Sequence, residues 1–194
     1  MLNLRHSQRG VTLIELMVGV VIIGILFAVA GPAYNGWIQN QQIRTAAESI
    51  LNGIQMTRST AVNNNGTARF VLCGLNTSSW EVLAASATAP APTASLACGA
   101  GSNAIAGEIR MQERSGNEGT RLAQVTVTPN GATTVTLNSL GRVATNADAS
   151  AAITQVDVST PTGTRPLRIT VGAAGNTRMC DPSALLAAND PRHC

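Results

Sequence analysis

The sequence of 194 residues contains no lysine, only two histidines and few aromatic side chains, which make up 3% of the chain. A serine–lysine catalytic pair is therefore excluded. His6 and His193 lie at opposite ends of the chain and offer little material for a histidine-based triad or a metal site. The scarcity of aromatic rings counts against a nucleic-acid module that binds by base stacking. The low charged fraction, 12%, argues against a disordered polyelectrolyte.

Other patterns that carry chemistry are missing as well. The glutamates and aspartates are scattered along the sequence, and no glycine-rich phosphate loop of the GxxxxGK type occurs. The net charge of +3 is too small to identify an anionic partner. We therefore expect a protein that is not an enzyme and that holds no cofactor or metal.

The cysteines are Cys73, Cys98, Cys180 and Cys194, and none belongs to a CxxC pair, the spacing that most zinc sites use. Disulfides formed in an oxidising compartment are the better interpretation. Three pairings are possible. Proximity along the sequence favours Cys73–Cys98 and Cys180–Cys194, because loop closure costs least entropy between nearby residues.

The most prominent feature of the sequence is a long apolar segment near the N-terminus, residues 11–34, in which only Thr12 and Glu15 are plainly polar. As a helix it rises about 36 Å, enough to cross the ~30 Å hydrocarbon core of a bilayer. Residues 1–10 carry arginine and no acid. The positive-inside rule therefore predicts a single-pass inner-membrane protein whose C-terminal domain is exported to the periplasm.

A cleaved secretory signal peptide is the alternative for this segment. Ala28-Val29-Ala30 fits its small-x-small cleavage site. The length of the apolar run and the position of Glu15 near its start count against this interpretation. A carboxylate in a membrane span costs about 2.5 to 3.5 kcal/mol, so Glu15 needs a cation or a position near the headgroups.

The stretch from Gly10 to Leu16, GVTLIEL, resembles the cleavage and methylation motif of type IV prepilins and type II secretion pseudopilins. The resemblance implies that residues 1–10 are a leader that prepilin peptidase removes after Gly10. It also implies N-methylation of Val11, where the family usually has phenylalanine. Glu15 matches the family glutamate that pairs with the N-terminal ammonium of a neighbouring subunit. Pro32 matches the helix-kinking proline.

A second helical pattern follows. Within residues 35–66, apolar side chains recur every three or four positions from Ile43 to Ala61, which indicates an amphipathic helix that packs on a sheet. We expect it to continue the apolar helix, with a bend around Gly31, Pro32 and Gly36. Asn63-Asn64-Asn65-Gly66 should end it in a left-handed conformation.

Residues 67–194 read as a β-rich domain. Strands are predicted at 67–73, 79–83, 105–111, 121–128, 133–137, 153–159 and 167–171. Pro129-Asn130-Gly131 is expected to join two of them in a hairpin. Short strands without a second helical pattern predict an α+β fold, with an antiparallel sheet that has one face on the helix and the other partly wet. We expect a loop at residues 84–104 and a tail at residues 172–194, each closed by one of the two favoured disulfides.

Three further patches resemble the GspH/FimT group of minor pilins and pseudopilins. They are residues 55–62 (QMTRSTAV), 138–143 (NSLGRV) and 175–182 (GNTRMCDP). Together with the leader they are spread over the whole chain. The resemblance implies the pilin fold and a structural subunit that enters a fibre through its N-terminal helix and contacts other pilins. The resemblance also implies that such a subunit resides in the inner membrane before assembly.

The resemblance leaves the apparatus open. A minor type IV pilin involved in assembly or initiation near the fibre tip is the leading hypothesis. A GspH-type pseudopilin of a type II secretion system is equivalent in fold and processing. Some FimT members bind DNA, and the C-terminal Arg165, Arg168, Arg178 and Arg192 suit phosphate contact. The Gly-Arg-x-Arg motif of the DNA-binding FimT members is incomplete in this chain, however, because Asn176 replaces the first arginine.

Overall fold

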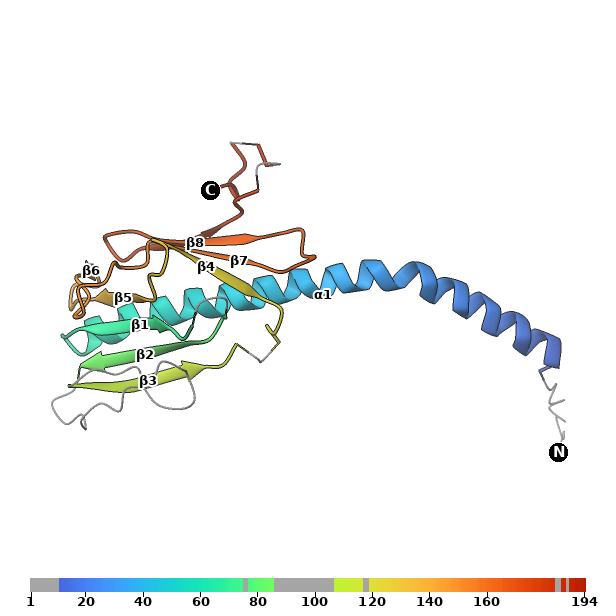
Figure 1. Cartoon of the computed structure of the whole chain (residues 1–194), viewed down its shortest axis with the longest axis horizontal. Coiled ribbons are helices and arrows are strands. Elements are labelled where there is room, and N and C mark those ends of the chain that lie inside the picture. The colour runs from blue at the N-terminus through green and yellow to red at the C-terminus, as the bar shows by residue number, and fades with distance from the viewer. Residues whose placement is uncertain (1–10, 75–76, 86–106, 117–118, 184–185, 188) are drawn as a thin grey trace, which may run out of the picture. The chain divides into compact units, whose positions relative to one another are not determined.

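The computed structural model describes residues 11–74, 77–85, 107–116, 119–183, 186–187 and 189–194. The chain divides into two compact units, Met1–Trp37 and Ile38–Cys194. A helix, α1 (Leu13–Asn63), begins in the first unit and ends in the second, and strands follow it (Figure 1). The predicted α+β class is confirmed, because the second unit packs α1 on antiparallel sheets.

Two sheets form the second unit. The five-stranded sheet has the order β3-β2-β1-β5-β6 and the four-stranded sheet the order β4-β7-β8-β9. Their strands are β1 (Ala68–Leu72), β2 (Trp80–Ala85), β3 (Glu108–Arg114), β4 (Gln124–Thr128), β5 (Thr134–Leu137), β6 (Val143–Ala144), β7 (Gln155–Ser159), β8 (Leu167–Val171) and β9 (Thr177–Cys180). All pairings between these strands are antiparallel.

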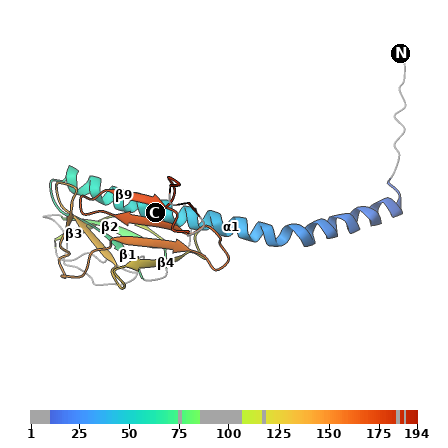
Figure 2. The same ribbon diagram turned by 90° about the horizontal axis from the view of Figure 1, so that it is seen from above.

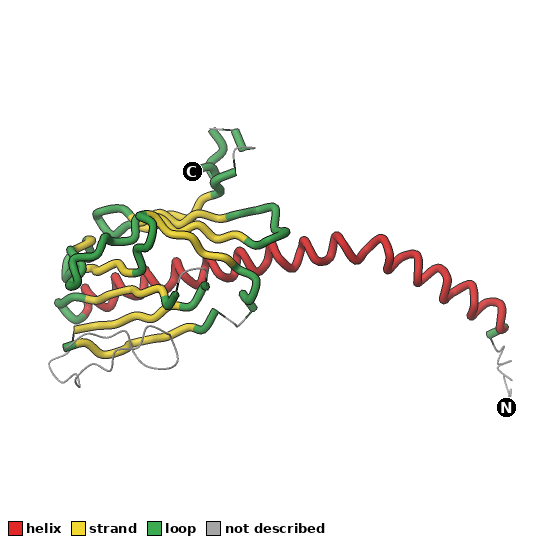
Figure 3. Tube along the Cα trace, in the orientation of Figure 1, coloured by secondary structure: helices red, strands yellow, loops and turns green. Residues whose placement is uncertain are grey.

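The core lies where α1 meets both sheets (Figure 3). The helix contributes the predicted apolar stripe, whose side chains are fully buried: Ile43, Ala46, Ala47, Ile50 and Ile54. The sheets contribute inward-facing residues from six strands, among them Phe70, Trp80, Val82, Val125, Val135, Val156, Val158 and Ile169. One helix stripe therefore holds two sheets in a single core.

A glycine sets the distance between α1 and the five-stranded sheet. A Cβ atom at Gly53 would lie 2.7 Å from the ring of Phe70 and 3.0 Å from the ring of Trp80. The two rings contact each other with centroids 5.8 Å apart. The indole N–H of Trp80 donates a buried hydrogen bond to the Ser49 hydroxyl over 2.9 Å. The helix is thus fixed to β1 and β2 by close packing and by one polar contact.

The C-terminus of α1 has the predicted left-handed residue. Asn65 has φ of 46°. The N–H of Gly66 donates to the Ala61 carbonyl (3.0 Å), and the N–H of Asn65 donates to the Val62 carbonyl (3.2 Å). These two bonds form a Schellman motif, which satisfies carbonyls that the helix end leaves free.

The prediction of a hairpin across Pro129-Asn130-Gly131 is wrong. Strand β4 pairs with β7 in one sheet, and β5 pairs with β1 in the other, so the turn carries the chain between sheets. The alternation of valine and threonine is compatible with either arrangement, because both strands direct valines into the same core. Period-two alternation identifies a strand, but it does not identify the strand's partner.

The sheet face away from α1 was predicted to be partly wet. The four-stranded sheet fits this prediction, with Gln124 and Thr126 exposed. The far face of the five-stranded sheet is drier, because Arg69, Glu81 and Leu83 are buried there, with Glu81 fully inaccessible. Arg69 makes two hydrogen bonds to Glu108, of 2.7 and 2.6 Å, and Arg110 lies 3.2 Å from Glu81. Charges can be buried on this face because oppositely charged partners accompany them. The strands β6 and β9 were missed, since they are short and β9 lies in the presumed tail.

Candidate functional site

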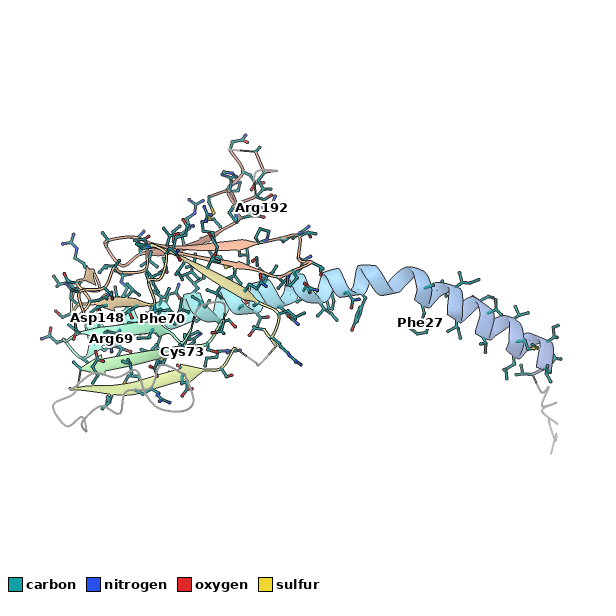
Figure 4. The ribbon with its side chains drawn as sticks, viewed as in Figure 1. Phe27, Arg69, Phe70, Cys73, Asp148 and Arg192 are labelled. Atoms are coloured by element: carbon teal, nitrogen blue, oxygen red, sulfur yellow. A yellow bond between two sulfur atoms is a disulfide. The ribbon has the colours of Figure 1, made fainter. Side chains whose placement is uncertain are left out.

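The first part of α1 presents a row of exposed apolar side chains. Between Val11 and Phe27, thirteen large apolar residues are exposed, by fractions from 51% at Ile22 to 78% at Leu13. Phe27 projects from the helix in Figure 4. Such a surface is typical of a segment that is covered by a partner or by lipid. Among the residues that the structure describes, no helix combines the length and the apolar character needed to cross a membrane.

Thr12 and Glu15 lie at the N-terminus of α1, which begins at Leu13. The backbone N–H of Glu15 donates to the Thr12 hydroxyl over 3.3 Å, so Thr12 is an N-cap. The spacing Thr-x-x-Glu is that of a capping box, which the sequence analysis did not identify. Glu15 is exposed in the first turn. Its carboxylate is therefore compatible with the positive end of the helix dipole and is accessible to a cation from another chain.

An aromatic pair follows the apolar segment. The rings of Tyr34 and Trp37 are stacked with centroids 6.2 Å apart, and both side chains are about 60% exposed. This pair was not predicted from the sequence. Pro32 lies within α1, and its kinking role remains a prediction.

The three patches that resemble the GspH/FimT group meet in space at the C-terminal end of α1. Gly141, from the second patch, has φ of +69°, and a Cβ there would lie 2.8 Å from the guanidinium Nε of Arg58, from the first patch. Gly175, from the third patch, has φ of +72°, and its Cβ would lie 1.8 Å from the carbonyl oxygen of Gly141. We call this contact the glycine junction. Close packing at this junction therefore gives a structural reason for the three patches that resemble the GspH/FimT group.

A groove of about 570 Å³ lies beside the glycine junction. Its walls are the last turns of α1 and the turn that leads into β9, which lie side by side in Figure 2. It is lined by eight residues, of which all but Val62 and Gly175 have polar side chains: Gln55, Arg58, Ser59, Val62, Asn63, Gly175, Asn176 and Thr177.

The C-terminal loop is closed by the predicted Cys180–Cys194 disulfide, which is confirmed, with Cα atoms 5.2 Å apart. Inside it, the Arg178 guanidinium donates to the carbonyls of His193 (3.0 Å) and Pro191 (3.3 Å). Arg192 makes two hydrogen bonds to Asp190, of 2.7 and 3.0 Å, and thereby lowers the pKa of that carboxyl from 3.8 to about 2. The loop projects from the sheets, as the position of Arg192 in Figure 4 shows.

The other predicted disulfide lies partly outside the described residues. Cys73 is buried just after β1, and none of the described cysteines is free. Its expected partner, Cys98, falls in the part of the chain that the structure does not describe. The Cys73–Cys98 pairing therefore remains a prediction.

The four arginines proposed for DNA contact do not share one setting. Arg168, on β8, makes two hydrogen bonds to Asp157 on β7, of 2.6 and 3.1 Å. This contact raises the pKa of Arg168 above its usual value. Arg178 and Arg192 are engaged within the C-terminal loop. Arg165 is exposed on the loop between β7 and β8. Three of the four guanidiniums are thus occupied by groups of the same chain.

Comparison with known structures gives matches of low identity. Two crystal structures of the type IV minor pilin FimU from Pseudomonas aeruginosa align with TM-scores of 0.46 and 0.49 at 13% identity. They cover 70% and 74% of this chain and 90% and 91% of FimU.

Sequence relatives match only over a short stretch. A fimbrial protein of Moraxella nonliquefaciens is 42% identical over 59 residues, which are 30% of this chain and 38% of that protein. The type IV major fimbrial protein FimA of Dichelobacter nodosus is 45% identical over 53 residues, 27% of this chain and 32% of its own length. The chain therefore spans about a third of the length of these relatives.

Family assignment rests on two longer matches. Residues 5–31 match the prokaryotic N-terminal methylation motif, and residues 46–175 match the family described as type II transport protein GspH. The second match covers more than half of the chain and contains two of the three resembling patches whole, residues 55–62 and 138–143. The predicted membership is confirmed: the chain belongs to the GspH family and carries a prepilin-type N-terminal motif.

Proposed function

We propose that the protein is a minor type IV pilin, a structural subunit that enters a pilus through the first part of α1. The observation that carries this proposal is the row of exposed apolar side chains from Val11 to Phe27. This row lies on the segment that matches the methylation motif. An isolated domain gains nothing from such a surface, whereas a bundle of like helices buries it.

The proposed processing prepares this helix for assembly. Prepilin peptidase removes residues 1–10 after Gly10, and the new N-terminus at Val11 is methylated. The ammonium of Val11 then pairs with Glu15 of a neighbouring subunit. Before assembly the helix is anchored in the inner membrane with the second unit in the periplasm. Transfer into the fibre is feasible because contacts between helices replace contacts with lipid of similar polarity.

The second unit would be displayed on the fibre. It has a core of its own, and its C-terminal loop is braced by a disulfide and by Arg178. These features suit an exposed domain in an oxidising compartment. We place the subunit near the fibre tip, where a minor pilin assists initiation of assembly.

A pseudopilin of a type II secretion system is the second candidate, and the family description favours it. Processing and helix packing are the same in both machines. The fimbrial relatives match about a third of their own length, so they do not distinguish the two. DNA capture receives less support, because Arg168, Arg178 and Arg192 are engaged by groups of the same chain.

A deletion strain tests the proposal. We expect loss of the gene to reduce the number of surface fibres while type II exoprotein secretion stays normal, and the wild-type chain to be recovered in sheared fibres. Loss of exoprotein secretion with normal fibre number would instead identify a pseudopilin. Normal fibres and normal secretion would contradict both assignments.

A further inference from the structure

Two loops contact α1 at the point where the chain enters the second unit. They are residues 119–122, before β4, and residues 160–166, between β7 and β8; we call them the collar. Gln42 accepts a hydrogen bond from the Leu122 N–H over 3.2 Å, and Gln39 accepts one from the Thr162 N–H over 3.0 Å. In Figures 1 and 2 the loop between β7 and β8 lies beside the helix.

Asn40 fixes the second collar loop most firmly. Its side-chain oxygen accepts hydrogen bonds from the backbone N–H groups of Thr164 (3.0 Å) and Arg165 (3.3 Å). A Cβ atom at Gly163 would lie 2.6 Å from the side chain of Ile43, so this loop is pressed against the helix. The backbone of Arg165 is therefore held in place while its side chain is exposed.

The collar must lie close to the apolar segment along the chain. Asn40 is six residues beyond Tyr34, the last residue of that segment, and the intervening residues are helical. Six helical residues rise only about 9 Å. The residue that holds the second collar loop is therefore close along the chain to the segment that we place in the membrane.

The charge of the collar suits an anionic surface. Its charged residues are Arg121 and Arg165, both exposed, and residues 119–122 and 160–166 contain no carboxylate. Among the described residues, two exposed arginines form ion pairs, Arg44 with Glu48 and Arg192 with Asp190. Neither of these carboxylates belongs to the collar. Glu118 precedes the first loop and lies outside the described residues. Arg165 is therefore the better-defined cation of the collar.

We propose that the collar binds the phosphate groups of anionic phospholipids, with Arg165 as the principal contact and Arg121 as the second. A guanidinium donates to phosphate oxygens in a fixed fork geometry. Leu122, 44% exposed, adds an apolar side chain at the same surface. The contact would hold the second unit on the bilayer before assembly. This inference rests on the proposed function, because only a membrane-anchored subunit brings the collar to the lipid.

Vesicle binding by the second unit tests the inference. Residues 38–194 are suitable because every buried core residue belongs to this unit. We expect binding to vesicles of phosphatidylglycerol and phosphatidylcholine, and little binding to phosphatidylcholine alone. Arg165→Ala should weaken binding about fivefold, and Arg121→Ala with Arg165→Ala about 25-fold. Arg165→Lys should retain most of it.

The matched control is Arg142→Ala, which removes an exposed arginine beside the glycine junction and should leave vesicle binding unchanged. Equal binding by Arg165→Ala and the wild type would overturn the inference, as would binding to neutral vesicles. Tighter Arg165-dependent binding to duplex DNA than to vesicles would assign the same guanidinium to nucleic acid instead. Normal vesicle binding by a chain that never enters fibres would contradict the proposed function and leave the inference standing.

Discussion

A Cβ atom built on Gly175 would lie 1.8 Å from the carbonyl oxygen of Gly141. Both residues have positive φ, so both positions combine a left-handed backbone with close packing. The two glycines come from different patches and lie 34 positions apart in the sequence. The glycine junction thus joins the turn before β6 to the turn before β9, and the stem of Arg58 covers it.

Gly175→Ala should destabilise the protein by about 2 to 4 kcal/mol, because the new methyl group meets backbone that cannot rotate away and the residue is strained at positive φ. Thermal unfolding of residues 38–194 measures the effect. Gly66→Ala is the control, since its Cβ would make only an ordinary 3.6 Å contact. Equal melting temperatures for Gly175→Ala and the wild type would contradict the packing described here.

Arg178→Ala should loosen the C-terminal loop without unfolding the domain. The carbonyls of Pro191 and His193 lose their donor, while the disulfide still closes the loop. Amide hydrogen exchange should rise in residues 189–194 and stay unchanged in β8. Cys180→Ser should release the loop further and cost about 3 kcal/mol on chain-entropy grounds. Unaltered exchange in Arg178→Ala would show that the brace has no structural role.

The order of the same loop should depend on acid pH. The hydrogen bonds from Arg192 depress the pKa of Asp190 from 3.8 to about 2 in the folded protein. A depressed pKa stabilises the folded loop above pH 4, and this contribution is lost as the pH falls through about 2. NMR chemical shifts of Arg192 in the folded protein should therefore change with a midpoint near pH 2. In Asp190→Asn this transition should be absent, and its persistence there would assign it to another group.

Local patterns predicted much of this fold. The stripe of Ile43, Ala47 and Ile50 identified the buried face of α1, and the run of asparagines before Gly66 identified its end. Both features depend on residues close together in sequence. The Cys180–Cys194 pairing followed from the same proximity, because fourteen residues separate the two cysteines.

Features that depend on distant partners were not predictable in this way. The alternation in β4 and β5 does not show that they belong to different sheets. The burial of Glu81 depends on Arg110, which lies on the neighbouring strand β3. The meeting of Gly141 with Gly175 required the fold itself. The N-cap bond from Glu15 to Thr12 is local, and the Thr-x-x-Glu spacing could have predicted it from the sequence.

The most direct test of the account is the recovery of Glu15→Gln in sheared fibres. Glutamine keeps the shape of the side chain at helix position N3, but it removes the charge that would pair with the ammonium of a neighbouring Val11. We expect the variant to be inserted and cleaved after Gly10 like the wild type, as intact mass would show, and to be lost from the fibre fraction. Cleaved Glu15→Gln present in fibres at the wild-type level would contradict assembly through this ion pair.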